Sequence, residues 1–320
     1  MRLRPRRPLP PRQRLSRKKN RDPLSFERQI TPASIWRAFF SIASAAILAP
    51  LPSQAQRGPQ APPPLVQLGE PDQAEGQRIL EQFRGLGLAG DYYLEFQLRV
   101  MPRRGRDRVY RGEMWGALGS RGPVSRVSFS ADGVEHRLLV RDGPEPAVWH
   151  WRSGAAAQAK KLGVADLFAP LAQTDLTPFD LGRPYLYWPD FAYEGIVRMR
   201  GRPAHRFLLR PPADFAASYP ALTGVRVYLD AQFKALVQSE QLGARGRLLR
   251  SMSVLELKKI GDQWIVKSID LRDETTHNKT RFSVVGAALE QEFDEALFAP
   301  SALAENGRPP ASNRVTKIDP

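Results

Sequence analysis

The 320-residue sequence contains no cysteine and only four histidines: His136, His150, His205 and His277. Without cysteine the chain cannot form disulfides, thiolate zinc sites, a cysteine nucleophile or the lipid-modified cysteine of an anchored lipoprotein. No two of the four histidines have the spacing of metal ligands. We therefore expect the protein to use no metal and no other cofactor.

The sequence also lacks an apolar run of the roughly 20 residues that a membrane-spanning helix needs. The run at residues 38–49 is shorter, follows a basic segment and precedes the small residues Ser53 and Ala55. A basic region, a short apolar run and a small-x-small site are typical of a secretory signal peptide. We predict a signal peptide over 1–55, cleaved near Ala55, and a periplasmic mature protein. An uncleaved N-terminal anchor is the alternative.

Positive charge is concentrated at one end of the chain. Residues 1–55 hold ten arginines and two lysines against two acidic residues, whereas the rest of the chain contributes only +5 to the formal net charge of +15. A basic arm for nucleic acid would require a chain that stays in the cytoplasm, which the export signal argues against. We expect no nucleic-acid partner. Residues 56–70 are proline-rich and read as a tether.

Period-two alternation dominates the remaining sequence, as in Leu94, Phe96 and Leu98 between polar neighbours. We predict a mainly β fold with a few helices: one large curved antiparallel sheet, an incomplete barrel, with helices over its mouth. The expected domain is 71–300, followed by a disordered tail, 301–320. Helices are expected at 72–86, 155–172 and 175–187, the last broken near Gly182 and Pro184. Strands are expected at 94–100, 109–118, 124–129, 134–141, 147–151, 192–200, 204–210, 225–230, 235–242, 248–258, 264–272 and 280–288.

Catalytic chemistry has little support in the sequence. No serine lies in a nucleophile elbow, and His150 and His205 sit in strands, where a structural role is expected. Three carboxylates, Asp175, Asp180 and Asp190, read as helix-cap and loop residues. We expect a binding protein and not an enzyme. A secreted hydrolase that uses His150 or His205 is the rival hypothesis.

The predicted central helices carry more large apolar and aromatic side chains than one core-facing stripe of a helix needs. An apolar cavity between sheet and lid would suit acyl chains, because each buried methylene contributes ~0.8 kcal/mol. The plain alternative is that these side chains pack lid against sheet, which would suit a sensory or scaffold module. The predicted lining residues are Phe96, Leu98, Val227, Leu229, Met252 and Trp264 on the strands, and Leu167, Phe168, Tyr187, Trp188 and Phe191 in and after the lid.

Residues from Asp175 to about Pro300 carry a series of strand-and-turn signatures: a strand ending on Asp230, a strand carrying Glu240 before a glycine turn, and a lysine-rich turn before Trp264. This stretch resembles the LolA-like family of periplasmic outer-membrane lipoprotein-sorting proteins. The resemblance implies an incomplete barrel that carries lipoprotein acyl chains, or related lipids, from an inner-membrane exporter to an outer-membrane acceptor. We expect a monomer. Envelope-stress sensing on the same fold remains open.

Overall fold

The computed structural model describes residues 69–155 and 157–319, which belong to one compact unit of the chain. The predicted signal peptide, residues 1–55, lies outside the described residues, as does nearly all of the predicted tether, residues 56–70.

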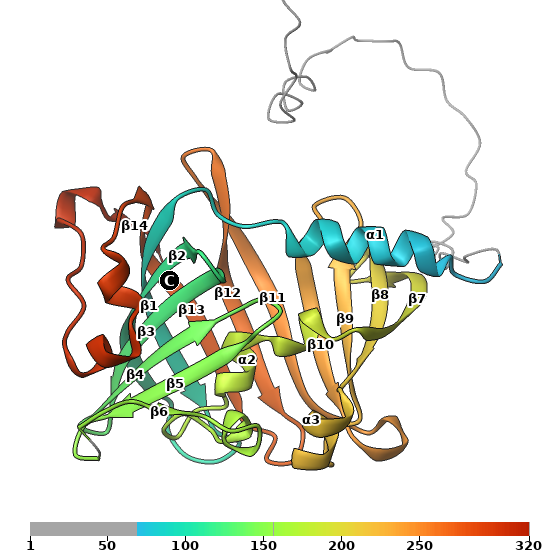
Figure 1. The fold of residues 1–320 in the computed structure, drawn as a ribbon, viewed down its shortest axis with the longest axis horizontal. Helices are drawn as coiled ribbons and strands as arrows, with labels where there is room; N and C mark the ends of the chain where they lie inside the picture. Colours follow the sequence, from blue (N-terminus) through green and yellow to red (C-terminus); the bar gives the residue numbers. More distant parts are fainter. Residues whose placement is uncertain (1–68, 156, 320) are drawn as a thin grey trace, which may run out of the picture. The chain divides into compact units, whose positions relative to one another are not determined.

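One antiparallel sheet of fourteen strands forms most of the fold (Figure 1). Its strands are β1 (Asp91–Met101), β2 (Arg108–Gly119), β3 (Gly122–Ala131), β4 (Val134–Arg141), β5 (Ala147–Arg152), β6 (Lys160–Lys161), β7 (Asp190–Met199), β8 (Arg202–Arg210), β9 (Gly224–Asp230), β10 (Leu236–Leu242), β11 (Leu248–Ile260), β12 (Gln263–Asp273), β13 (Lys279–Gln291) and β14 (Thr316–Lys317). Their order is β6-β5-β4-β3-β2-β1-β13-β12-β11-β10-β9-β8-β7, with β14 beside β13. Two meanders, β1–β6 and β7–β13, are thus joined where β1 pairs with β13.

The sheet is not closed into a barrel, because β6 and β7 stand at opposite ends of the strand order. This confirms the predicted fold class. The predicted strands also agree with the observed ones to within a few residues, since burial of one face of a strand imposes a period of two on its sequence.

The two faces of the sheet are defined by β1. Its core face carries Leu94, Phe96 and Leu98, all in the main apolar core, and its outer face carries Tyr93. Between Phe96 and the core side chains of β3 lies Gly112, where a Cβ would collide with the Phe96 ring. The core is therefore closely packed at the middle of the sheet.

Helix α1 (Gln73–Arg84) confirms the helix predicted near 72–86 and protects an edge of the sheet. The Asp72 side chain caps it by accepting from the amide of Ala74. The Gln73 side chain then bonds both backbone groups of Tyr193 on the edge strand β7, at 2.9 and 2.8 Å. These bonds use backbone groups that an edge strand would otherwise offer to another chain.

The central segment forms less helix than its apolar spacing predicts. The long helix expected at 155–172 is wrong: the structure has only β6 and a 3-10 turn, η1 (Ala165–Phe168), there. Gly163 and Pro170 interrupt that stretch, and Lys160–Lys161 pairs with β5 instead. The second stretch gives α2 (Pro178–Gly182) and η2 (Pro184–Tyr187), with the break where it was expected. We call residues 162–189 the lid.

The predicted disordered tail is also wrong. Residues after 300 form short 3-10 turns and β14, and they cover the outer face of the first meander (Figure 1). The Leu303 side chain is fully buried there. Arg126 and Arg137 of the sheet donate to backbone carbonyls of this segment: Arg126 to that of Glu305, and Arg137 to that of Ala304 at 2.6 Å. Isolated apolar anchors and backbone acceptors have no periodicity, so the sequence pattern does not reveal them.

This packing predicts that Leu303→Ala lowers the free energy of unfolding by about 2–4 kcal/mol, the usual cost of emptying a buried leucine site. Urea unfolding measures it. Leu86→Ala is the matched control, since Leu86 is 57% exposed and its loss should change stability by less than about 0.5 kcal/mol. Equal effects of the two substitutions would contradict the packed C-terminal segment.

Candidate functional site

A pocket of about 360 Å³ opens between the lid and the first meander. Its walls come from both ends of the strand order: β5 and β6 at one end, and the segments next to β7 and β8 at the other. We call it the seam pocket. It is lined by Arg141, Pro144, Pro146, Ala147, Val148, Lys161, Leu162, Val164, Leu167, Pro178, Gly182, Pro184, Tyr187, Trp188, Pro189, Pro212, Asp214 and Phe215.

Six of the lining residues are prolines. A proline ring presents apolar surface, fixes its own backbone angle and has no N–H that would need a partner. Loop backbone can therefore form part of this wall without presenting buried donors at those positions. The wall is both apolar and stiff.

Aromatic rings hold the lid against helix α3 (Ala213–Ser218), a short helix that the sequence analysis does not predict. The Phe168 ring stacks on Tyr219 at 3.8 Å between centroids, and the Trp188 ring meets Phe215 edge to face at 5.2 Å. Phe179 of α2 lies 4.5 Å from Phe168. This cluster closes one side of the seam pocket.

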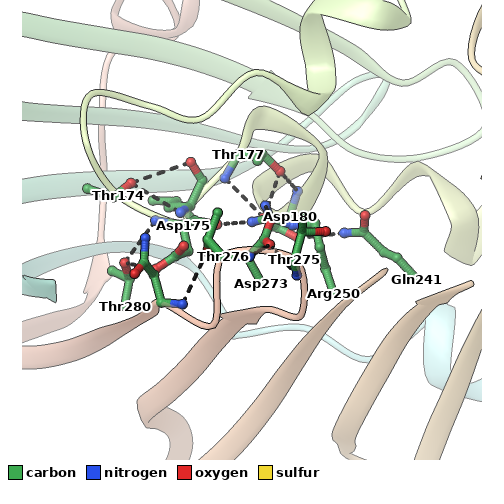
Figure 2. A network of polar contacts seen from close by, with 12 residues as sticks. Thr174, Asp175, Thr177, Asp180, Gln241, Arg250, Asp273, Thr275, Thr276 and Thr280 are labelled. Atoms are coloured by element: carbon green, nitrogen blue, oxygen red, sulfur yellow. Dashed lines mark hydrogen bonds and ion pairs between the residues drawn. The ribbon is translucent and has the colours of Figure 1, made fainter. Parts of the chain in front are cut away.

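A buried polar network fixes the lid to the sheet beneath it (Figure 2). Arg250 of β11 lies 3.0 Å from the carboxylate of Asp273 and 3.5 Å from that of Asp180 in α2, and it also donates to the backbone carbonyl of Asp175. Gln241 of β10 donates to the other oxygen of Asp180 at 3.0 Å. One guanidinium thus joins two strands to the lid.

The carboxylates in this network are shielded from water. Burial raises the pKa of Asp180, and the charge of Arg250 opposes that rise. Burial likewise raises the pKa of Asp175, which accepts a hydrogen bond from Thr280 at 2.8 Å. Asp180 also completes a capping box with Thr177, so Thr177 is the helix cap and not Asp175 as expected. The aspartates serve to position the lid.

A second ion pair holds the far end of the lid. Arg183 has the left-handed backbone conformation, φ 40°, that separates α2 from η2. Its guanidinium lies 3.2 Å from the Asp142 carboxylate, at the end of β4. Burial raises the pKa of Asp142 against the lowering effect of Arg183. The lid is thereby tied to both meanders.

This arrangement predicts that Arg250→Met destabilises the protein by about 3–5 kcal/mol, because the carboxylate of Asp180 keeps its burial and loses its counter-ion. Chemical unfolding measures the loss. Adding Asp180→Asn to that variant should restore part of it, while Arg247→Met, on an exposed neighbouring arginine, should be nearly neutral. A neutral Arg250→Met would show that the network does not hold the lid.

The structure separates the predicted lining residues into three groups. Leu167, Tyr187 and Trp188 line the seam pocket. Trp264 is misplaced: it is 57% exposed on the outer face, one position from the core residue Ile265. The others belong to the core or pack against it: Phe96, Leu98, Val227, Leu229 and Met252 are buried, and Phe168 and Phe191 are partly buried.

Sequence reasoning missed most of the pocket wall, including Arg141, Lys161, Val164 and Phe215. The sequence pattern indicates only tether and break positions for the prolines, and no pocket wall. Their density around Pro144 and Pro212 was a usable signal, but nothing in the sequence places those two turns side by side.

The histidines have structural partners. His136 on β4 and His150 on β5 lie diagonally across the strand pair, and their ring nitrogens are 3.2 Å apart. His205 bonds the Tyr193 hydroxyl at 2.8 Å. Asp190, expected in a loop, begins β7 and forms an ion pair with Arg210 at 3.1 Å. Among the described residues no group of three His, Asp or Glu side chains is placed to hold a metal ion.

The histidine pair predicts an acid-sensitive fold. Burial, with the charges of His136 and Arg152, lowers the pKa of His150 to about 4. An unfolded histidine takes up its proton near pH 6.5, so the unfolded state binds more protons between these values. Stability should be full above about pH 7 and should fall as the pH drops toward 4.

His150→Gln should flatten that decline, and His277→Gln, in an exposed turn, should leave it unchanged. Unfolding free energies at several pH values from 7.5 to 4 measure both. Parallel curves for the wild type and His150→Gln would contradict the prediction.

Comparisons with known proteins agree with the fold. A family model described as an uncharacterized protein matches residues 149–305. No curated protein sequence matches the chain. Among solved structures, a DUF1329 family protein from Desulfovibrio piger aligns with a TM-score of 0.62 and 14% identity, over 72% of this chain and 98% of its own.

Two further solved structures align over nearly their whole length. One, described as an outer membrane lipoprotein-sorting protein domain from Vibrio parahaemolyticus, aligns with a TM-score of 0.63 and 14% identity, over 73% of this chain and all of its own. A LolA superfamily protein from Nitrosomonas europaea gives 0.52 and 14%, over 70% and 96%. The chain has a LolA-like fold, which confirms the fold that the resemblance implied.

Within the described ranges, no helix combines the length and the apolar character that a bilayer crossing requires.

Proposed function

We propose that this protein is an exported carrier that binds the apolar chain of a lipid or lipoprotein in the seam pocket. The observation that carries the proposal is the pocket itself: an apolar, proline-stiffened space at the open side of a sheet, closed by an anchored lid. The LolA-like fold supports it, since one structural neighbour is described as a lipoprotein-sorting domain. Fold likeness alone does not assign a function, so the pocket has to carry the assignment.

The lining suits binding and offers little for catalysis. Its described members include no histidine, serine or threonine. Holding a chain needs none of these, because each methylene removed from water contributes ~0.8 kcal/mol. The rival hydrolase would have to use His150 or His205, which are bonded to His136 and Tyr193 outside the pocket wall.

A scaffold or sensory module is the second candidate, and one observation favours it. The core face of the sheet is filled by side chains such as Leu98, Val227 and Leu229, each fully buried. The seam pocket lies at the margin of this filled core. A protein that never binds a ligand in the seam pocket would act by binding other proteins at its surface.

The proposed cellular setting follows from the N-terminal sequence. The signal peptide predicted over residues 1–55 would deliver the chain to the periplasm. There it would receive its cargo from the inner membrane and hand it to an acceptor at the outer membrane. Intact-mass measurement of the periplasmic fraction tests this setting, with a mature chain expected to begin near Gln56.

Filling the pocket tests the carrier function. Ala147 is a half-buried lining residue, so Ala147→Trp should occupy the space while leaving the aromatic cluster intact. We expect at least a tenfold loss of affinity for the uncharged probe N-phenyl-1-naphthylamine and little change in melting temperature. The loss corresponds to removing about two methylene contacts or more.

The control is Ala155→Trp, an exposed alanine in the turn after β5 that does not line the pocket. It should bind the probe as the wild type does. Native mass spectrometry of gently purified protein adds an independent readout, with co-purified lipid expected. A wild-type protein that carries no lipid and binds no probe would replace the carrier by the scaffold.

A further inference from the structure

Two basic side chains lie in the wall of an otherwise largely apolar pocket. Arg141 ends β4 and Lys161 ends β6, and both line the seam pocket. Both also lie near one aromatic ring: the Arg141 guanidinium carbon is 4.9 Å and the Lys161 nitrogen 5.8 Å from the centre of the Trp149 ring. Trp149 itself is not among the lining residues, but its ring contacts both cations.

These two cations differ from others around the pocket in having no acidic partner. Lys160, the neighbour of Lys161, binds Asp166 at 2.9 Å, and Arg183 of the lid binds Asp142 at 3.2 Å. Within residues 69–155 and 157–319, neither Arg141 nor Lys161 lies within ion-pair distance of an aspartate or glutamate. Their N–H groups remain available to a ligand.

Negative charge is sparse in the wall of the seam pocket. Asp214, in the first turn of α3, is the one carboxylate among the described lining residues. It is exposed and belongs to the wall formed by α3, whereas Arg141 and Lys161 belong to the wall formed by the sheet. The described lining therefore has an excess of one positive charge, on the wall that the sheet forms.

Resting on the proposed carrier function, we propose that the ligand of the seam pocket is a single-chain amphiphile with a terminal anionic group, a carboxylate or a phosphate, held by Arg141 and Lys161. The apolar chain occupies the proline and aromatic walls. The anionic group lies beside Arg141 and Lys161, which can donate to it.

The size of the pocket supports one chain. Its volume of about 360 Å³ is near the lower end of the ~300–1,000 Å³ range of small-molecule sites. A lipid with several acyl chains would have to displace the core that fills the sheet, including Leu98 and Val227. A free fatty acid or an alkyl phosphate needs no such displacement.

The test compares ligands that share a chain and differ in the head. Dodecanoate, dodecyl phosphate and the uncharged dodecanol compete with N-phenyl-1-naphthylamine on the full chain at pH 7.5. We expect at least one anion to bind at least tenfold more tightly than dodecanol, and this preference to fall as sodium chloride rises from 50 to 500 mM. Which anion binds more tightly distinguishes the carboxylate from the phosphate.

The Arg141→Gln/Lys161→Gln variant should lose that preference, to within about threefold, and keep the affinity for dodecanol. The matched control is Arg152→Gln/Lys160→Gln, which removes the same charge from the first meander, at the ends of β5 and β6 and outside the pocket wall. It should keep the preference. Asp214→Asn should strengthen binding of the anion by a few-fold.

Several results would overturn the inference. Equal binding of dodecanol and both anions by the wild type, or an undiminished preference in the Arg141→Gln/Lys161→Gln variant, rejects the anionic site and leaves the carrier function standing. Tighter binding of a diacylated lipopeptide than of either anion does the same. If no alkyl ligand displaces the probe, and the probe itself does not bind, the carrier function fails as well.

Discussion

The pairing of β1 with β13 is the contact on which this fold depends. It joins residues nearly 200 positions apart, with Leu98 opposite Phe282 and Phe96 opposite Val284, and it converts two separate meanders into one sheet. Once that pair has formed, β6 and β7 are left as the two ends of the strand order. The sheet curves around a core without closing, because no strand among the described residues pairs β6 with β7. The lid and α1 cover these two open ends of the sheet.

Each open end is covered in a different way. At β7, the Gln73 amide of α1 bonds to the backbone of Tyr193, so the edge is capped by a single side chain. At β6, the strand is only two residues long, and the chain leaves it to cross the sheet as the lid. Arg250 and Arg183 fix that crossing through buried ion pairs. The seam pocket lies between the lid, the first meander and α3.

The sequence predicted the strands well because burial of one face dictates alternation, and alternation survives wherever a strand is regular. The prediction failed where the strands are irregular. On β11, register shifts between Val254 and Leu257 change which residues oppose β12, and both parities of the hairpin are apolar. The assignment of Trp264 to the core face was wrong for this reason. The lid and the C-terminal segment were misjudged because single anchors such as Leu303 have no period.

The pocket was harder to predict than the fold because its wall is assembled from turns and strand ends. Pro144, Leu167 and Pro212 are far apart in sequence and meet only through the strand order. Structural neighbours at 14% identity share the strand arrangement, which burial maintains through many substitutions. Lining residues in loops are free of that constraint. Under the proposal made above, the ligand of this chain is therefore determined at the seam pocket, by residues such as Arg141 and Lys161, and not by the sheet.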